Sequence, residues 1–263
     1  MFKKLLLYTL FCFGLCQTKE PISAICFDIE TILTTDDMKA SSYVGKVKSL
    51  MYATKIGHLP CQKDLFSKLE KVPALSHLTT YNNNLSMPLI FSDWLINKQP
   101  ASSCLNKITS FLENSSSEKI PSIQKEVLEN IAKMMLNPSA LIDTQKVISS
   151  TEKLIEQLKQ KGYKLYLTGN WAHLETLQKE FGRLLKNFNG IFLSGKLKAL
   201  KPHQDYYDTV LGEIKINPSN ILWIEKEPHF IASMKKHNFN VISYNPKDKK
   251  TIYKELQGFN ISL

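Results

Sequence analysis

Residues 151–168 read TEKLIEQLKQKGYKLYLT and contain a helix, a stop and a strand in succession. Apolar residues in the first half recur at three- and four-residue spacing, namely Leu154, Ile155 and Leu158. This spacing places them on one face of an amphipathic helix. Gly162 is a typical helix stop, and residues 164–168 follow it as a short apolar strand. The segment therefore predicts a helix that packs against a buried strand.

The alternation of helix and strand continues along the chain to residue 244. Amphipathic helices are indicated at residues 174–188, 202–214 and 230–234, and short apolar strands at 190–194, 220–224 and 240–244. Residues 22–27 supply a further apolar strand near the N-terminus. Strands that alternate with helices imply right-handed crossovers and a parallel sheet covered on both faces. We therefore predict an α/β fold with a Rossmann-like, doubly wound parallel sheet.

A long insert separates the first of these strands from the others. Residues 37–149 show no convincing two-residue alternation and contain helix-like pieces joined by polar turns. The pieces lie at residues 41–53, 62–75, 89–97, 105–112 and 123–136. We expect residues 22–36 and 150–263 to form the α/β core, and residues 37–149 to form an inserted, all-helical cap subdomain.

Residues 1–21 have the anatomy of a signal peptide. Lys3 and Lys4 precede an apolar run at residues 5–16, which is too short for a comfortable transmembrane span. This leader predicts a secreted or periplasmic protein, with membrane association only through the leader itself. Cys16 leaves a membrane-anchored lipoprotein as an alternative, and a buried helix of the fold is a third interpretation.

The composition is that of an ordinary globular protein, with 43% hydrophobic and 22% charged residues. The net charge of +10 fits an anionic small ligand, but the lysines are scattered along the chain, so no nucleic-acid partner is expected. After the leader only Cys26, Cys61 and Cys104 remain, without a CxxC motif, and the six histidines form no pair at metal-binding spacing. We therefore expect neither a disulfide framework nor a zinc site.

Polar residues suited to phosphoryl transfer follow the predicted strands. Ligands of an open parallel sheet bind beyond the carboxyl ends of its strands, so these residues should meet at one edge. They are Asp28 and Glu30 after the first strand, Thr168, Gly169 and Asn170 after a second, Lys201 before a later helix, and Glu225 after a third strand. A carboxylate that attacks a phosphoester needs a metal and an ammonium group to offset the repulsion between anions. Mg²⁺ prefers oxygen ligands, which Asp28, Glu30 and Glu225 could supply.

The order of these residues resembles the four motifs of the haloacid dehalogenase-like (HAD) superfamily of hydrolases. The resemblance spans most of residues 22–245. Its clearest segments are LTGNWAHLETL (167–177), GIFLSGKLKALKPHQDYYDTVL (190–211) and NILWIEKEPHFIASMKKHNFNVI (220–242). They look most like subfamily I, the branch with a helical C1-type cap between the first two motifs.

The resemblance implies a role for each candidate. Asp28 would be the nucleophile, Glu30 the acid and base, Thr168 with the amides of Gly169 and Asn170 the phosphoryl-binding groups, Lys201 the charge clamp, and Glu225 a metal ligand. It also implies a Mg²⁺-dependent phosphatase that acts on a small phosphorylated metabolite through an aspartyl-phosphate intermediate.

Three positions depart from the family pattern. Glu30 stands where Asp is usual, Thr31-Ile32 where Gly-Thr is usual, and Glu225-Lys226 where two acids are usual. Lys226 replaces an anion that would help to hold the metal, unless Glu227 compensates. Two alternatives therefore stay open. One is a catalytically impaired binding or regulatory protein with this fold. The other is a haloacid dehalogenase, which expects a non-acidic residue where this chain has Glu30.

Overall fold

The computed structural model describes residues 21–69, 76–81, 85–114, 121–246 and 248–263. The predicted leader at residues 1–21 lies outside these ranges except for Pro21, so its fate stays a prediction. Within the part that the structure describes, no helix is both long and apolar enough to cross a membrane.

A five-stranded parallel sheet forms the centre of the larger lobe. Its strands are β1 (Ala24–Asp28), β6 (Lys164–Gly169), β7 (Gly190–Leu193), β8 (Ile221–Glu225) and β9 (Asn240–Ser243). They lie in the order β7-β6-β1-β8-β9, and every neighbouring pair is parallel. The strand order reverses at β1, so the sheet is doubly wound, and the predicted α/β fold is confirmed.

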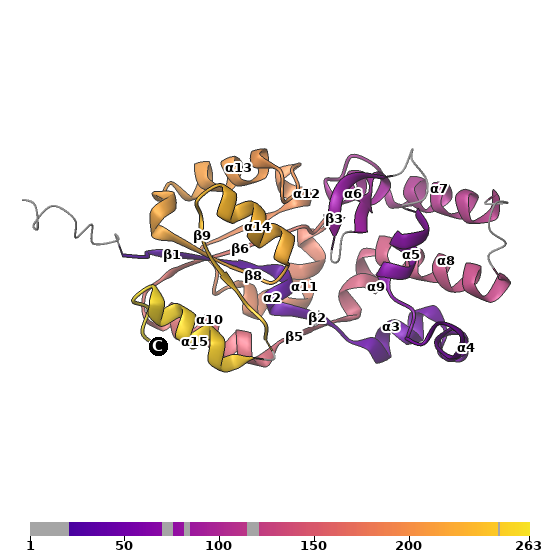
Figure 1. The fold of residues 1–263 in the computed structure, drawn as a ribbon, viewed down its shortest axis with the longest axis horizontal. Helices are drawn as coiled ribbons and strands as arrows, with labels where there is room; N and C mark the ends of the chain where they lie inside the picture. Colours follow the sequence, from indigo (N-terminus) through magenta and orange to yellow (C-terminus); the bar gives the residue numbers. More distant parts are fainter. Residues whose placement is uncertain (1–20, 70–75, 82–84, 115–120, 247) are drawn as a thin grey trace, which may run out of the picture.

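Helices cover both faces of this sheet (Figure 1). One face packs on α10 (Ser149–Gln160), α11 (Leu174–Leu185) and α15 (Lys249–Gly258), and the other on α13 (Gln204–Ile214) and α14 (Pro228–Lys236). Side chains alternate along β1, so Ile25 and Phe27 enter the first core, and Ala24 and Cys26 the second. All four are fully buried, which explains why the strand reads as a continuous apolar run.

The insert forms a second lobe with its own apolar core (Figure 1). Its helices are α3 (Asp37–Val44), α4 (Lys46–Ile56), α5 (Gln62–Leu69), α6 (Leu89–Leu95), α7 (Ala101–Asn114), α8 (Ser122–Leu136) and α9 (Pro138–Asp143). The helix predicted over residues 41–53 is split in two at Gly45, whose φ of 97° is a backbone conformation that favours glycine.

The expectation of an all-helical cap is wrong. Strands β3 (Ser76–Tyr81) and β4 (Leu85–Pro88) form an antiparallel hairpin inside it. The first strand ends in Thr79, Thr80 and Tyr81, which favour strands, and three asparagines separate the two runs in the sequence. The sequence does not predict this hairpin, because its strands are short and lack a clear alternation of apolar and polar residues.

The two lobes are joined by a short ribbon and a second contact. Strands β2 (Leu33–Thr35) and β5 (Gln145–Val147) pair antiparallel where the chain enters and leaves the insert, next to the predicted boundaries. At the second contact, Asn97 of the cap donates hydrogen bonds to the carbonyl oxygens of Ala172 and Gly195, and Ser194 donates to that of Leu95. The cap is therefore held to the core at the ribbon and at this contact.

Replacing Gly195 with alanine should destabilise the protein. The added Cβ would lie 1.9 Å from the carbonyl oxygen of Ala172, which is a backbone atom and cannot rotate away. Overpacking of this kind costs about 1–3 kcal/mol in the free energy of unfolding, which urea denaturation measures. As a matched control, Gly212→Ala in α13 meets no atom within 4 Å and should stabilise the protein by up to about 1 kcal/mol. Equal effects of the two substitutions would contradict the tight contact.

Candidate active site

Asp28 ends the central strand and begins a helical turn, α2 (Ile29–Ile32). Its Oδ1 accepts a hydrogen bond of 2.8 Å from the backbone N–H of Glu30, so the carboxylate caps this turn. Thr31 has no positive φ, and its hydroxyl donates to the carbonyl oxygen of Asp28 at 2.6 Å. The turn therefore needs no glycine at Thr31, and this departure from the family pattern is accommodated.

Lys201 joins the carboxylates at the ends of two neighbouring strands. Its side chain is fully buried, and its Nζ donates hydrogen bonds to Asp28 Oδ2 and, at 2.5 Å, to Glu225 Oε2. The ammonium group also lies 4.5 Å from the centre of the Phe230 ring, which adds a cation–π contact. A buried cation with two carboxylate partners and an aromatic face is fixed in both charge and position.

Asn170 fixes the backbone of Lys201. Its side-chain Oδ1 accepts from the Lys201 N–H at 3.0 Å, and its Nδ2 donates to the Lys201 carbonyl oxygen at 3.1 Å. These paired hydrogen bonds tie the loop after β6 to the loop before α13. The structure thus gives the side chain of Asn170 a positioning contact, and the predicted binding of substrate by this residue stays a prediction.

Thr168 and Gly169 bring the end of β6 against Asp28. Thr168 pairs with Asp28 across the sheet, and its hydroxyl donates to the carbonyl oxygen of Phe27 at 3.2 Å. Gly169 has a φ of 151°, and a Cβ there would lie 2.5 Å from a methyl carbon of Ile29. Only glycine allows this approach. The hydroxyl of Thr168 can still accept a hydrogen bond from a ligand.

Tyr206 contacts the backbone at the end of β6. Its place at the site could not be predicted from the sequence. Its hydroxyl accepts from the Gly169 N–H at 2.8 Å and donates to the carbonyl oxygen of Phe192 at 2.7 Å. Burial raises its pKa, so the phenol stays neutral and can donate. The backbone N–H of Gly169, predicted to bind a phosphoryl group, therefore donates its hydrogen bond to Tyr206 in this structure. In the sequence, Tyr206 reads only as an apolar position on the buried face of a helix.

Burial and charge shift the titration of the groups on this edge. Burial, followed by the charge of Asp28, raises the pKa of Glu225 to about 7, although Lys201 acts in the opposite direction. Burial alone would lower the pKa of Lys201, but the charges of Asp28 and Glu225 together outweigh it, and the pKa lies well above its usual range. Lys201 is therefore charged at neutral pH, whereas Glu225 changes between its protonated and ionised forms near neutral pH.

Glu227, rather than Lys226, turns towards the site. Glu227 is 3% exposed, and its N–H donates to Glu225 Oε1 at 3.2 Å, whereas Lys226 is exposed. Burial raises the pKa of Glu227; Lys226, Lys63 and Lys201 lower it. Glu225 ends β8, and Glu227, in extended backbone two residues later, is buried beside it.

The carboxylates of this edge offer the oxygen ligands that a magnesium ion takes, although among the described residues no three of them lie close enough together to form a ready metal cluster. Asp28, Glu225 and Glu227 are buried and offer only oxygen atoms, and Mg²⁺ usually takes one or two carboxylates together with water. Within the described ranges, Glu227 Oε2 is buried without a hydrogen-bond partner. A cation would satisfy such an atom. Glu30 is half-buried and follows Asp28 in the first turn of α2, so it flanks the same edge.

The family model described as "Haloacid dehalogenase-like hydrolase" matches residues 79–244, more than half of the chain. This range includes Thr168, Gly169, Lys201 and Glu225, and it begins after Asp28. No curated protein sequence matches the chain.

Solved structures share the fold at low identity. A HAD family enzyme from Bacteroides thetaiotaomicron, in complex with magnesium and inorganic phosphate, is 12% identical, with a TM-score of 0.52 over 86% of this chain and 96% of that one. The HAD hydrolase YfnB from Bacillus subtilis, bound to magnesium, is 16% identical, with a TM-score of 0.53 over 92% and 100%. A dehalogenase in an intermediate complex is 17% identical, with a TM-score of 0.50 over 86% of each chain. These similarities show the fold.

Glu225 should make the stability of the protein depend on pH between about 4.5 and 7. The folded chain holds a proton on Glu225 that the unfolded chain releases above its ordinary pKa of 4.5, because burial moves the folded value to about 7. Raising the pH through this window therefore lowers the free energy of unfolding. Glu225→Gln lacks this titration, so its stability relative to the wild type should increase from pH 4.5 to pH 7 in denaturant titrations.

Glu213→Gln is the matched control, because Glu213 is exposed on α13. Its difference from the wild type should be the same across the window. A constant difference for Glu225→Gln would show that the folded pKa of Glu225 is not raised.

Proposed function

The chain belongs to the haloacid dehalogenase-like hydrolase family, and from this premise we propose that it is a Mg²⁺-dependent phosphatase of a small phosphorylated metabolite. The observation that carries the proposal is the buried bridge from Asp28 through Lys201 to Glu225 at the carboxyl ends of β1 and β8. This bridge supports the proposal because it joins the proposed nucleophile Asp28 and the proposed metal ligand Glu225 to one buried positive charge. A dehalogenase is less well supported, because it expects a non-acidic residue where this chain has Glu30. Cleavage of a phosphate ester, in contrast, needs an acid to protonate the leaving alcohol, and Glu30 can supply it.

In the first step, one carboxylate oxygen of Asp28 attacks the phosphorus atom of the ester. A P–O bond to Asp28 forms, and the P–O bond to the alcohol breaks. Glu30 donates a proton to the departing oxygen, so that an alcohol leaves and an aspartyl-phosphate remains. The N–H of Glu30 holds Asp28 Oδ1, and Lys201 holds Oδ2, so the nucleophile is oriented before the substrate arrives.

In the second step, water attacks the phosphorus atom of the aspartyl-phosphate. Glu30, now ionised, accepts a proton from this water, the P–O bond to Asp28 breaks, and inorganic phosphate is released. Lys201 stays charged throughout because its pKa is well above the usual range, and it offsets the negative charge that develops on the phosphoryl oxygens.

Asp28, Glu225 and Glu227 would hold Mg²⁺, with Glu30 beside them. When bound, the ion neutralises the charge of phosphoryl oxygens and thereby reduces their repulsion of the Asp28 carboxylate. The structure of the similar enzyme from Bacteroides thetaiotaomicron contains magnesium and inorganic phosphate, which supports the choice of ion and ligand for this chain.

A catalytically impaired binding protein is the second candidate. Glu30 carries one methylene more than the usual aspartate, roughly 1.5 Å of extra reach, and catalytic geometry is sensitive on this scale. The same edge could then bind a phosphorylated ligand without turning it over.

We also propose that the leader directs the protein to a secreted or periplasmic location, with a lipid anchor at Cys16 as the alternative. The partner is a small phosphorylated molecule. Nucleic acid is not proposed as a partner, and membrane association would occur only through the leader. Mass spectrometry of the mature N-terminus distinguishes cleavage from acylation.

The wild-type protein should release phosphate from a panel of small phosphate esters only when Mg²⁺ is present. Asp28→Asn should lower kcat by about 10³-fold or more, because it removes the nucleophile. Glu30→Gln should lower kcat by about 10²–10⁴-fold, because it removes the proton transfer. Released phosphate is measured by a colorimetric assay, and Glu213→Gln, on the outer face of α13, serves as the unaffected control.

A wild-type rate equal to that of Asp28→Asn for every ester would contradict the phosphatase. If the wild type nevertheless binds a phosphorylated ligand in calorimetry, the binding protein is the better account.

Glu227→Gln should weaken Mg²⁺ binding by about 10–100-fold, the range for losing one partner of a metal site. The loss is expected because Glu227 Oε2 is buried and has no other hydrogen-bond partner in the described ranges. Lys226→Gln is the comparison: it removes an exposed positive charge that acts on Glu227, so it should not weaken Mg²⁺ binding. Calorimetric titration with Mg²⁺ measures both. Unchanged affinity in Glu227→Gln would remove Glu227 from the metal site.

A further inference from the structure

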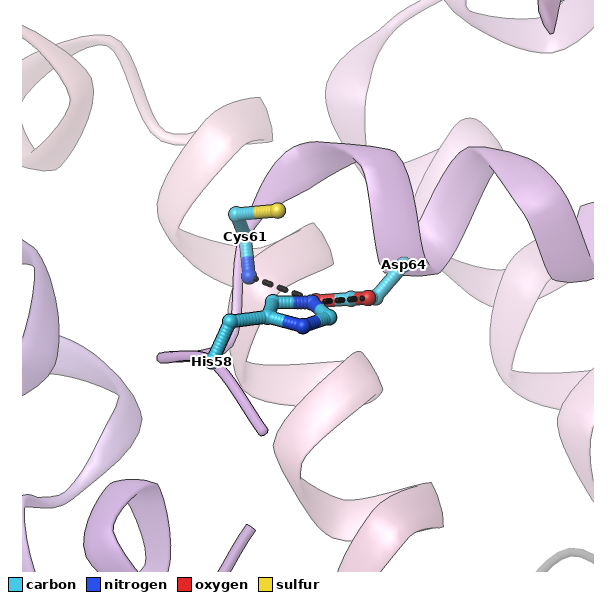
Figure 2. Close-up of side chains that lie close together, drawn as sticks. All are labelled: His58, Cys61 and Asp64. Atoms are coloured by element: carbon cyan, nitrogen blue, oxygen red, sulfur yellow. Dashed lines mark hydrogen bonds and ion pairs between the residues drawn. The ribbon is translucent and has the colours of Figure 1, made fainter. Parts of the chain in front are cut away.

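Three side chains of types that can bind a metal meet in the cap (Figure 2). His58, Cys61 and Asp64 each offer one ligand atom, and these atoms lie within 4.8 Å of one another. The residues follow one another at three-residue spacing where the loop after α4 leads into α5. Neither a CxxC motif nor a histidine pair marks the site in the sequence, which is why no zinc site was expected there.

The geometry points to a zinc site formed by His58, Cys61 and Asp64. Thiolate, imidazole and carboxylate together are the ligand set of Zn²⁺, whereas Mg²⁺ and Ca²⁺ take oxygen ligands alone. Ligand atoms of a tetrahedral zinc site are about 3.3–3.6 Å apart, from zinc bond lengths of about 2.0–2.3 Å. His58 Nε2 and Asp64 Oδ1 are 2.9 Å apart, so they need to separate by only a few tenths of an ångström.

Helix capping explains part of this arrangement but not all of it. Asp64 Oδ2 accepts from the N–H of Cys61 at 2.8 Å, which is the reciprocal contact of a capping box at the start of α5. Capping does not require an imidazole on the other carboxylate oxygen or a thiol beside the pair. The same N–H also fixes the carboxylate so that Oδ1 is turned towards His58 (Figure 2).

The surroundings leave one side of the cluster open to solvent. The side chain of His58 is 51% exposed and that of Asp64 13% exposed. Tyr52 is buried, and its ring lies edge-on at 6.5 Å from that of His58. Three protein ligands with an exposed side leave the fourth position to water.

Binding would replace the proton of the Cys61 thiol. Burial, followed by the charge of Asp64, raises the pKa of Cys61, so the metal-free thiol is protonated. The S–H proton passes to solvent as the S–Zn bond forms, and no oxidant or reductant is needed.

The location suggests what the metal would do. It would tie residues 57–61 to the first turn of α5 and so stabilise the cap by linkage, since the unfolded chain lacks the preformed site. Lys63 lies between two of the ligands, and its charge reaches Glu227 at the sheet edge. Zinc would therefore fix the part of the cap that carries Lys63, whose charge lowers the pKa of Glu227.

Cobalt substitution tests the site without measuring catalysis. The full chain, untagged and reduced, is titrated with Co²⁺, and a sulfur-to-cobalt charge-transfer band in the near ultraviolet is expected. The band should vanish in Cys61→Ser and persist in the double variant Cys12→Ser/Cys16→Ser, which removes the leader thiols. Mg²⁺ in excess should leave the band unchanged, which separates this site from the carboxylates of the sheet edge.

Zinc affinity provides the second readout. His58→Ala and Asp64→Asn should each weaken Zn²⁺ binding at least about 10–100-fold, and His237→Ala, an exposed histidine on the other lobe, should leave it unchanged. Zn²⁺ should also raise the Tm of the wild type but not that of Cys61→Ser, and circular dichroism without metal shows whether each variant is folded. A band that survives in Cys61→Ser, or wild-type zinc affinity in His58→Ala, would overturn the proposal.

Discussion

The contact between Lys201 and two buried carboxylates constrains the rest of the structure. Removing an ammonium group from water costs several kcal/mol unless its partners are placed well, and here Asp28 and Glu225 are supplied by neighbouring strands of one sheet. The pairing of β1 with β8 sets the distance between the two acids. Asn170 then holds the lysine backbone from the loop after β6, the strand on the other side of β1. The sheet order is thus the reason why residues nearly two hundred positions apart form one site.

This dependence on sheet order explains what the sequence could predict. Parallel strands that alternate with helices end at the same edge, so polar residues after each strand could be expected to meet, and Asp28, Thr168 and Glu225 do. Lys201 could be placed with them through the family resemblance. Tyr206 and Phe230 could not, because each lies on the buried face of a helix, where an aromatic residue reads as ordinary core. Their contacts with Gly169 and Lys201 arise only from tertiary packing.

The cap is harder to predict because several of its elements are short and they follow no regular alternation with strands. The β3–β4 hairpin lies between helices and needs only a few residues per strand, so its pattern was too weak to compete with helical spacing. The His58, Cys61 and Asp64 cluster depends on the direction in which the loop turns into α5. The spacing of three residues in a loop does not predict that their side chains point the same way. His58, Cys61 and Asp64 lie close together because α5 begins there, and the Asp64 carboxylate accepts a hydrogen bond from the Cys61 N–H.

Charge balance at the sheet edge supports the proposed binding of a divalent cation there. Asp28, Glu225 and Glu227 are buried beside a single ammonium group, so full ionisation leaves an excess of two negative charges in a region that excludes water. The raised pKa values of Glu225 and Glu227 show that the protein on its own favours retaining protons there. A phosphate ester would bring further negative charge to the same place. Protonation relieves the excess but weakens the acids as ligands, whereas a divalent ion relieves it and leaves them ionised. Lys226 is exposed and its charge lowers the pKa of Glu227, so it favours the ionised form of the one acid that follows it inward.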